Sequence, residues 1–316
     1  MIRFHARTAR VAACFLVAAV LAGCGGDAPQ TDRADVPRTS PALTTVEAEW
    51  RSERRERLLA EDGWTSLVGL HWLELRAHYV GSEPTSGIRL AVGPPKLGLV
   101  QQERERVYFT PEKGVEVAVE GAPVSGRVEL TGEGTAPVEL RFDEGRGRLS
   151  LITRGARRAL RVKHADAPAR TGFGTIDYWP ADARWMIEAR FEAHPAGRTI
   201  GIANIIGGVE QLPSPGAVNF SHGGTAYRLE TLDDGSGGLF LVFADRTNGH
   251  GSYGAGRYLD APLPDAQGRV MLNFNRSYNP PCAFTAFATC PLPPPENRLD
   301  LAVTAGEKAY AKPSGT

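Results

Sequence analysis

The chain has 316 residues, and its 36 Lys and Arg residues balance 36 Asp and Glu residues, so the formal charge is zero. Without a basic excess the chain lacks the attraction to phosphates that nucleic-acid binding requires, so we expect no nucleic-acid partner. The length suffices for a sizeable core in one large domain or two modest ones. Gly (36) and Pro (23) are abundant without forming a repeat, which is typical of a compact, turn-rich β protein.

Residues 1–23 have the composition of a secretory signal peptide. Three arginines and no acidic residue precede an apolar run from Val11 to Ala22, which is too short for a permanent membrane helix. The run ends in Leu-Ala-Gly-Cys, which resembles the lipobox of bacterial lipoproteins. This resemblance implies cleavage before Cys24 and acylation of its thiol, and therefore a membrane as partner. The alternative is an ordinary cleaved signal that a cysteine follows by chance.

Residues 24–45 are expected to form a disordered tether between the lipid and the folded body, because Pro, Thr, Asp and Ala dominate this segment. Gly25 rather than Asp follows the cysteine, which by the sorting rule of enteric bacteria favours the outer membrane. We therefore expect a lipid-anchored protein of the cell envelope that faces the periplasm. Its mature chain has 33 Lys and Arg against 36 Asp and Glu, a formal charge of −3.

A helix and a first β region are predicted within residues 46–164. Residues 46–62 are rich in helix formers, and Val46, Trp50 and Leu58 lie at spacings of four and eight, which place them on one apolar face. Gly63 marks the end of this helix. The mixture of Arg and Glu indicates a solvated opposite face with ion pairs between neighbouring turns.

Strands are predicted on both sides of a boundary near residues 164–170. Before it, apolar and charged residues alternate in short stretches such as 138–142, as they do in half-buried antiparallel strands. After it, residues 165–316 form a second β region, with the same alternation at 185–191 and further short strands separated by turn residues. The predicted fold class is therefore mainly β, with an N-terminal helix, an antiparallel sandwich-like half, and a second half that is barrel-like or a sandwich.

Several long motifs occur along the body of the chain. They are GWTSLVGLHWLE, RALRVKHADAPAR, GLFLVFADRTNG, LNFNRSYNPPCAFTAFATCPLPPPENRL and AGEKAY. From about Trp50 to Tyr310 the chain resembles a bacterial family catalogued as domain-of-unknown-function family 1684. In one departure, this chain has Asn273-Phe274-Asn275 where the family pattern has Asp-Phe-Asn, which argues against a role that needs a carboxylate there. The resemblance implies no established activity.

The stretch from 239 to 307 is the expected location of a functional site, because polar and conformationally restricted residues crowd there more densely than a fold needs. Strand alternation would direct Asp245 to an apolar side, where a carboxylate needs a partner, and Arg257 is available. Such a pair is suited to hold an anionic or polar ligand, together with Asn248 and Tyr253. Alternatively, Asp245 and Asn248 form an Asx turn that ties down their own backbone.

The second part of the candidate ligand site follows the apolar alternation of residues 270–274. Asn273 and Asn275 are expected to share the opposite face of that strand and to meet either solvent or a cavity. Tyr278 and Asn279 lead into two prolines that hold the backbone extended, so a rigid pocket wall is predicted. A structural loop pinned by proline explains the same residues.

The Asn-Pro-Pro-Cys and Thr-Cys-Pro motifs carry Cys282 and Cys290, the two cysteines of the folded body. Seven residues separate them, and an oxidising envelope compartment favours a disulfide between them. The alternatives are a reactive thiol paired with a distant histidine, and a two-cysteine metal site that lacks its other ligands.

The predicted function is binding of a small molecule or an envelope component by a non-catalytic lipoprotein, at the surface between Asp245 and Glu296. One alternative is a hydrolase of unrecognised type that uses Asp245, His250 or Cys282 as acid, base or nucleophile. The other is a structural or assembly lipoprotein. The sequence contains no Gly-x-Ser-x-Gly, His-Glu-x-x-His, P-loop or strand-linked Gly-x-Gly-x-x-Gly motif, so no cofactor or metal is expected.

Overall fold

Helix α1 (Pro41–Leu59) begins the part of the chain that the computed structural model describes, residues 39–134 and 136–312. The helix starts five residues earlier than predicted because Ser40 caps it, accepting a hydrogen bond from the Leu43 N–H at 3.1 Å, and because a proline occupies the first turn. The predicted tether therefore ends before Pro41. The predicted signal peptide, Cys24 and residues 24–38 lie outside the described residues.

The buried face of α1 differs from the predicted one. Leu58 is buried as expected, but Val46 is 47 % exposed, so its assignment to the apolar face is wrong. Glu47 and Arg54 take the buried positions instead, because each has an ion-pair partner in the second half of the chain. None of the described helices is long and apolar enough to cross a membrane.

Two sheets form the first half of the chain. The six-stranded sheet has the order β1-β11-β10-β9-β6-β7 and the five-stranded sheet the order β3-β2-β4-β5-β8. Neighbouring strands are antiparallel except for β2 and β3, which run parallel. The strands are β1 (Leu67–Trp72), β2 (Ala77–Gly81), β3 (Ile88–Arg89), β4 (Gly98–Glu103), β5 (Arg106–Pro111), β6 (Val117–Val119), β7 (Ala122–Pro123), β8 (Val128–Leu130), β9 (Glu139–Phe142), β10 (Gly147–Arg154) and β11 (Arg157–His164).

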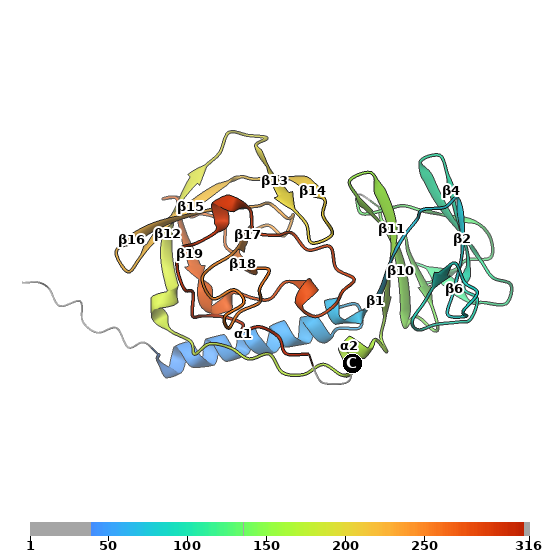
Figure 1. Cartoon of the computed structure of the whole chain (residues 1–316), viewed down its shortest axis with the longest axis horizontal. Coiled ribbons are helices and arrows are strands. Elements are labelled where there is room, and N and C mark those ends of the chain that lie inside the picture. The colour runs from blue at the N-terminus through green and yellow to red at the C-terminus, as the bar shows by residue number, and fades with distance from the viewer. Residues whose placement is uncertain (1–38, 135, 313–316) are drawn as a thin grey trace, which may run out of the picture. The chain divides into compact units, whose positions relative to one another are not determined.

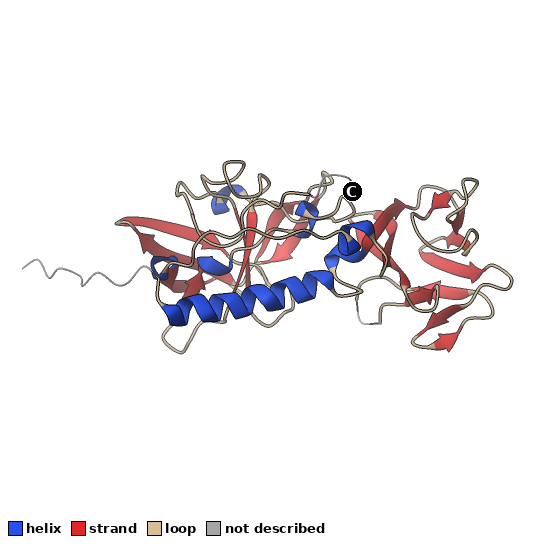
Figure 2. Cartoon of the chain, turned by 90° about the horizontal axis from the view of Figure 1, so that it is seen from below, coloured by secondary structure: helices blue, strands red, loops and turns tan. Residues whose placement is uncertain are grey.

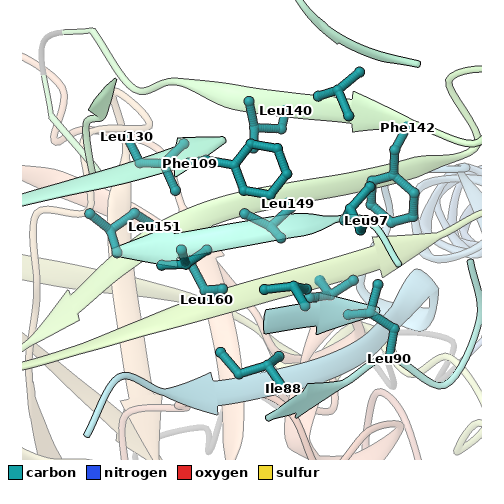
Figure 3. Packing of buried hydrophobic residues seen from close by; sticks show 14 of the residues in the cluster. Ile88, Leu90, Leu97, Phe109, Leu130, Leu140, Phe142, Leu149, Leu151 and Leu160 are labelled. Atoms are coloured by element: carbon teal, nitrogen blue, oxygen red, sulfur yellow. The ribbon is translucent and has the colours of Figure 1, made fainter. Parts of the chain in front are cut away.

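The two sheets share one hydrophobic core. Leu149 and Leu160 of the six-stranded sheet belong to the same buried cluster as Phe109 and Leu130 of the five-stranded sheet, and Figure 3 shows these apolar side chains gathered between the strands. The alternation read from the sequence places every second side chain in this core. The sandwich-like arrangement predicted for the first half is thus confirmed.

The described strands of the second half form three separate antiparallel sheets. One has four strands in the order β16-β15-β12-β19, and the others are the pairs β13-β14 and β17-β18. The described strands do not join into one closed sheet, so of the two predicted alternatives the barrel-like one is not formed. The strands are β12 (Met186–Ala193), β13 (Thr199–Ala203), β14 (Val209–Pro213), β15 (Gly216–His222), β16 (Thr225–Glu230), β17 (Leu239–Phe243), β18 (Arg257–Ala261) and β19 (Arg269–Asn273).

Phe274 lies at the centre of the second core. The rings of Trp185, Phe220 and Phe243 surround it, with centroids 6.1, 5.6 and 5.6 Å away. Such tilted and edge-on aromatic contacts add to the burial of apolar area. Short helices join the strands: α2 (Pro168–Thr171) and the 3-10 turns η1 (Trp64–Ser66), η2 (Ala183–Trp185), η3 (Phe274–Arg276), η4 (Pro281–Ala283) and η5 (Pro295–Asn297).

Helix α1 packs along the second half of the chain, and both Figure 1 and Figure 2 show this arrangement. One hydrophobic cluster lies within residues 68–167 and another within residues 185–305. A third cluster joins Leu67 of β1 to Tyr258 and Cys290. The division of the body into residues 46–164 and 165–316 stays a prediction.

Candidate functional site

The Asp245–Arg257 pair, the centre of the predicted ligand site, is inaccessible to solvent. Asp245 follows β17, and the antiparallel pairing of β17 with β18 sets Phe243 opposite Arg257. Arg257 Nη2 donates to Asp245 Oδ2 at 2.7 Å, and both side chains are 0 % exposed. The structure therefore brings these two residues together, but inside the protein.

Further hydrogen bonds occupy both partners of this pair. The Arg257 guanidinium also donates to the carbonyl oxygens of Val303, at 2.8 Å, and Ala305. Asp245 Oδ1 accepts from the N–H groups of Thr247 and Val303, at 2.8 and 3.2 Å. Burial lowers the pKa of the Arg257 guanidinium, and the Asp245 charge opposes that shift. The pair fastens β18 to the C-terminal segment and leaves no carboxylate oxygen for a ligand.

Asn248 stabilises the loop that connects β17 to β18 through hydrogen bonds of its side chain. Its Oδ1 accepts from the Asp245 N–H at 2.6 Å, and its Nδ2 donates to Ser252 Oγ at 3.0 Å and to the Tyr253 carbonyl at 2.8 Å. The half-buried Tyr253 donates its hydroxyl to the Cys282 carbonyl at 3.3 Å. These contacts match the turn-forming alternative for Asp245 and Asn248.

Asn273 and Asn275 do not share a strand face, because β19 ends at Asn273 and the 3-10 turn η3 follows. Asn273 Nδ2 donates to Glu47 Oε1 of α1 at 2.8 Å. Asn275 is fully buried, and its amide exchanges hydrogen bonds of 2.9 and 3.0 Å with the backbone of Asp182. Both asparagines therefore join segments of the fold.

Tyr278 and Asn279 contact α1 and the C-terminal segment. The Tyr278 ring lies 4.5 Å from the Arg54 guanidinium, and its hydroxyl donates to Asp260 Oδ1 at 3.0 Å. The Asn279 N–H donates to Glu307 Oε2 at 2.7 Å, and Arg54 donates to the Asn279 carbonyl at 3.0 Å. The loop before the two prolines is thus anchored both to α1 and to the C-terminal segment.

Three buried residues of this network were absent from the sequence-based site: Glu47, Arg54 and Glu307. The helix pattern gave no signal for the first two, because Glu and Arg in a helix usually face solvent. Glu307 belongs to the AGEKAY motif, which supported the family resemblance but predicted no role for this residue. Asn297, in the PPPEN segment, is a fourth such residue, with its amide bonded to the backbone of Glu230 and Val242.

Cys282 and Cys290 lie side by side with free thiols. The Cys282 N–H donates to Cys290 Sγ at 3.1 Å. The disulfide between them stays a prediction, to which this proximity is favourable. His250 is exposed, and within the described chain no hydrogen bond joins it to Asp245 or Cys282.

An apolar pocket of about 250 Å³ lies beside the loop that joins the two cysteines. We call it the Phe284 pocket. Five stretches far apart in the sequence line it: the start of β1, Ala91 after β3, the region of α2, the loop between the two cysteines, and the C-terminal segment. The lining residues are Leu67, Val68, Ala91, Pro168, Ala169, Gly172, Phe284, Thr285, Ala286, Phe287, Tyr310 and Lys312.

Stacked aromatic rings support one wall of the Phe284 pocket. Tyr310 stacks on Phe173 and meets Phe284 edge-on, with centroids 5.0 Å apart in each case. The Gly174 N–H donates to the Tyr310 hydroxyl at 3.0 Å, which fixes the ring. Among the described residues of the lining, Lys312 is the one charged side chain, and Thr285 contributes a hydroxyl. The pocket therefore combines an apolar interior with the cation of Lys312.

Comparison with known proteins agrees with the motifs in the second half of the chain. A family model described as "Protein of unknown function (DUF1684)" matches residues 171–308, a narrower span than the predicted resemblance from Trp50 to Tyr310. Among solved structures, an uncharacterized protein of Haloarcula marismortui, determined by solution NMR, is 31 % identical. The match covers 44 % of this chain and 78 % of that chain, with a TM-score of 0.37. No curated protein matches the sequence. The chain belongs to the family of proteins of unknown function DUF1684.

Proposed function

We propose that this protein is a lipid-anchored protein of the cell envelope that binds a small molecule with an apolar body and a negatively charged group in the Phe284 pocket. The pocket itself carries the proposal, because it pairs an apolar lining with Lys312. The signal peptide and the Leu-Ala-Gly-Cys sequence at Cys24 support the anchor. The proposal keeps residues 284–287 of the predicted Asp245–Glu296 surface and replaces the polar candidate residues of that surface with an apolar lining.

The size and lining of the pocket favour a small apolar group. Its volume of about 250 Å³ is just below the usual range of ligand pockets, roughly 300–1,000 Å³. Phe284, Phe287 and Leu67 provide apolar contact area. Removing about 200 Å² of ligand surface from water would contribute about 5 kcal/mol before the entropy cost of association is subtracted.

The charge of the ligand follows from Lys312. This side chain is exposed and belongs to the pocket lining. A lysine can keep its ammonium group in water while its stem covers apolar surface, so it suits a ligand whose charged end stays at the mouth of the pocket. Thr285 adds a hydroxyl that can donate to an oxygen of the same group.

The polar cluster around Asp245 is a weaker candidate for ligand binding. Its carboxylate oxygens already accept hydrogen bonds from Arg257, Thr247 and Val303. A ligand would have to displace these bonds in a buried site, where an unpaired charge is costly. This mutual hydrogen bonding favours a second candidate function, a structural or assembly role in which the Phe284 pocket binds nothing.

Calorimetric titration of decanoate and decanol into the mature chain tests the proposal. A Cys24→Ser substitution removes the acylation site without touching a described residue. We expect decanoate to bind once per chain and more tightly than decanol, and Lys312→Gln to remove that preference. The matched control is Lys113→Gln, which removes an exposed cation away from the pocket lining.

Blocking the pocket tests the location of the site. Ala286 is exposed and lines the pocket, so Ala286→Trp fills the entrance and should reduce decanoate binding at least tenfold. Ala266→Trp, at an exposed turn outside the pocket lining, should bind like the parent chain. Unchanged binding by Ala286→Trp would refute the pocket, and no binding by any variant would support the structural role.

A further inference from the structure

Cys282 and Cys290 differ in their access to solvent. Cys290 is 4 % exposed, whereas Cys282 is only half-buried. The two residues are neighbours, because the Cys282 N–H donates to Cys290 Sγ at 3.1 Å and both belong to the cluster around Tyr258. A molecule that approaches from solvent therefore meets Cys282 first.

The backbone on both sides of the pair is anchored independently. The Cys290 carbonyl accepts from the Ile205 N–H at 3.0 Å, and the Leu292 N–H donates to the Ala203 carbonyl at 2.7 Å. On the other side, Asn279 is held by Glu307 three residues before Cys282. These anchors keep the two thiols together, so little chain entropy is lost when a bond forms between them.

The surroundings of the two thiols also differ in their effect on ionisation. Hydrogen bonding with Cys290 lowers the pKa of the Cys282 thiol, and the Tyr253 hydroxyl acts in the same direction. Hydrogen bonding with Cys282, together with burial, raises the pKa of the Cys290 thiol. The thiolate is the nucleophile in exchange reactions, and the more exposed cysteine is also the one whose thiol ionises more readily.

We propose that Cys282 and Cys290 form a redox-active dithiol that exchanges with small-molecule disulfides, with Cys282 as the attacking thiol and Cys290 as the resolving thiol. The Cys282 thiolate attacks one sulfur of a disulfide RSSR, forms a Cys282–S–S–R bond and releases RS⁻. Cys290 then loses its proton to solvent and attacks Cys282 Sγ, which releases the second RS⁻. The protein loses two electrons and two protons, and the disulfide is reduced to two thiols.

Single substitutions separate the two roles. The reduced, acylated lipoprotein, purified in detergent, is mixed with oxidised glutathione, and the products are followed by mass spectrometry. We expect Cys290→Ser to accumulate a stable mixed disulfide between glutathione and Cys282. Cys282→Ser, the matched variant, should form a mixed disulfide at the buried Cys290 at least tenfold more slowly. Equal rates, or faster reaction at Cys290, would overturn the assignment of roles.

Two measurements on the unsubstituted protein do not depend on how the variants fold. Brief alkylation of the reduced protein with iodoacetamide should modify Cys282 before Cys290. In buffers with an increasing proportion of reduced glutathione, the protein should convert reversibly from the disulfide form to the dithiol form. The masses of the two forms differ by two hydrogens. A bond that persists in excess reduced glutathione, or thiols that oxidised glutathione never oxidises, would overturn the proposal. Neither result bears on ligand binding in the Phe284 pocket.

Discussion

Arg54 in helix α1 donates to Glu307, 253 positions later in the chain, over 3.1 Å. Their side chains are 10 % and 0 % exposed. Glu307 also accepts from the Asn279 N–H at 2.7 Å, so one carboxylate joins the helix, the Asn-Pro-Pro loop and the C-terminal segment. A buried charge pair of this kind holds the fold together only while both partners are present.

Removing one partner of this pair should destabilise the protein strongly. Arg54→Met leaves the Glu307 carboxylate buried without its cation, for which we expect a loss of about 3–5 kcal/mol in the free energy of unfolding. Urea unfolding followed by tryptophan fluorescence measures this loss. The matched control is Arg57→Met, since Arg57 and its partner Glu53 are 58 % and 66 % exposed and should contribute about 0.5 kcal/mol or less. Similar losses in both variants would contradict the assignment.

The stability of the fold should require an amide side chain at Asn273. Its Nδ2 donates to Glu47 Oε1 at 2.8 Å, so Asn273→Asp sets two carboxylates against each other beside α1. We expect about 1.5–3 kcal/mol of destabilisation at pH 7, moderated by Arg276, which also pairs with Glu47. Asn219→Asp is the matched control, because its partner Glu192 is 61 % exposed.

The pH dependence of Asn273→Asp has a definite sign. Two adjacent carboxylates raise the pKa of one of them in the folded state above its unfolded value. The folded state then binds the extra proton more tightly, so the destabilisation is present at neutral pH and is relieved as the pH falls through the raised pKa. Unfolding curves at pH 7 and pH 5 should converge toward the parent protein at the lower pH. A gap that widens on acidification would contradict this account.

Asp245 should prove structural. Asp245→Asn leaves the Arg257 charge buried without its counter-ion, and we expect a loss of about 3–5 kcal/mol in the free energy of unfolding. Asp300→Asn is the matched control, since Asp300 and its partner Arg246 are 80 % and 64 % exposed and the change should be about 0.5 kcal/mol or less. An Asp245→Asn protein with parental stability would instead return Asp245 to the list of possible catalytic groups.

His71 should make the protein sensitive to mild acid. Burial lowers the pKa of its imidazole, and its Nε2 is buried without a hydrogen-bond partner in the described part of the chain. The unfolded state therefore binds the proton more readily, so stability is lost as the pH falls below about 6.5, the ordinary pKa of histidine. His71→Phe should lose less stability than the parent between pH 7 and pH 5 in thermal melts. The exposed His250→Phe should follow the parent curve.

The sequence predicted the mainly β fold and the location of the polar cluster, but not the role of that cluster. Alternation of apolar residues identifies which strands are half-buried, because it depends only on neighbouring positions. Whether Asp245 and Asn273 face a ligand or other protein groups depends on Val303 and Glu47, which lie 58 and 226 positions away. The Phe284 pocket as a whole was missed for the same reason, since its lining comes from five stretches that lie far apart in the sequence.

The most direct test of the ligand site is an NMR titration of decanoate into residues 24–316 carrying Cys24→Ser, with alanine methyl groups labelled by ¹³C. Ala169 and Ala286 line the Phe284 pocket, so their methyl groups should shift on addition of decanoate and show contacts to its methylene chain. Shifts confined to the loop from Asp245 to Tyr253 would contradict the proposal and restore the surface that the sequence predicted.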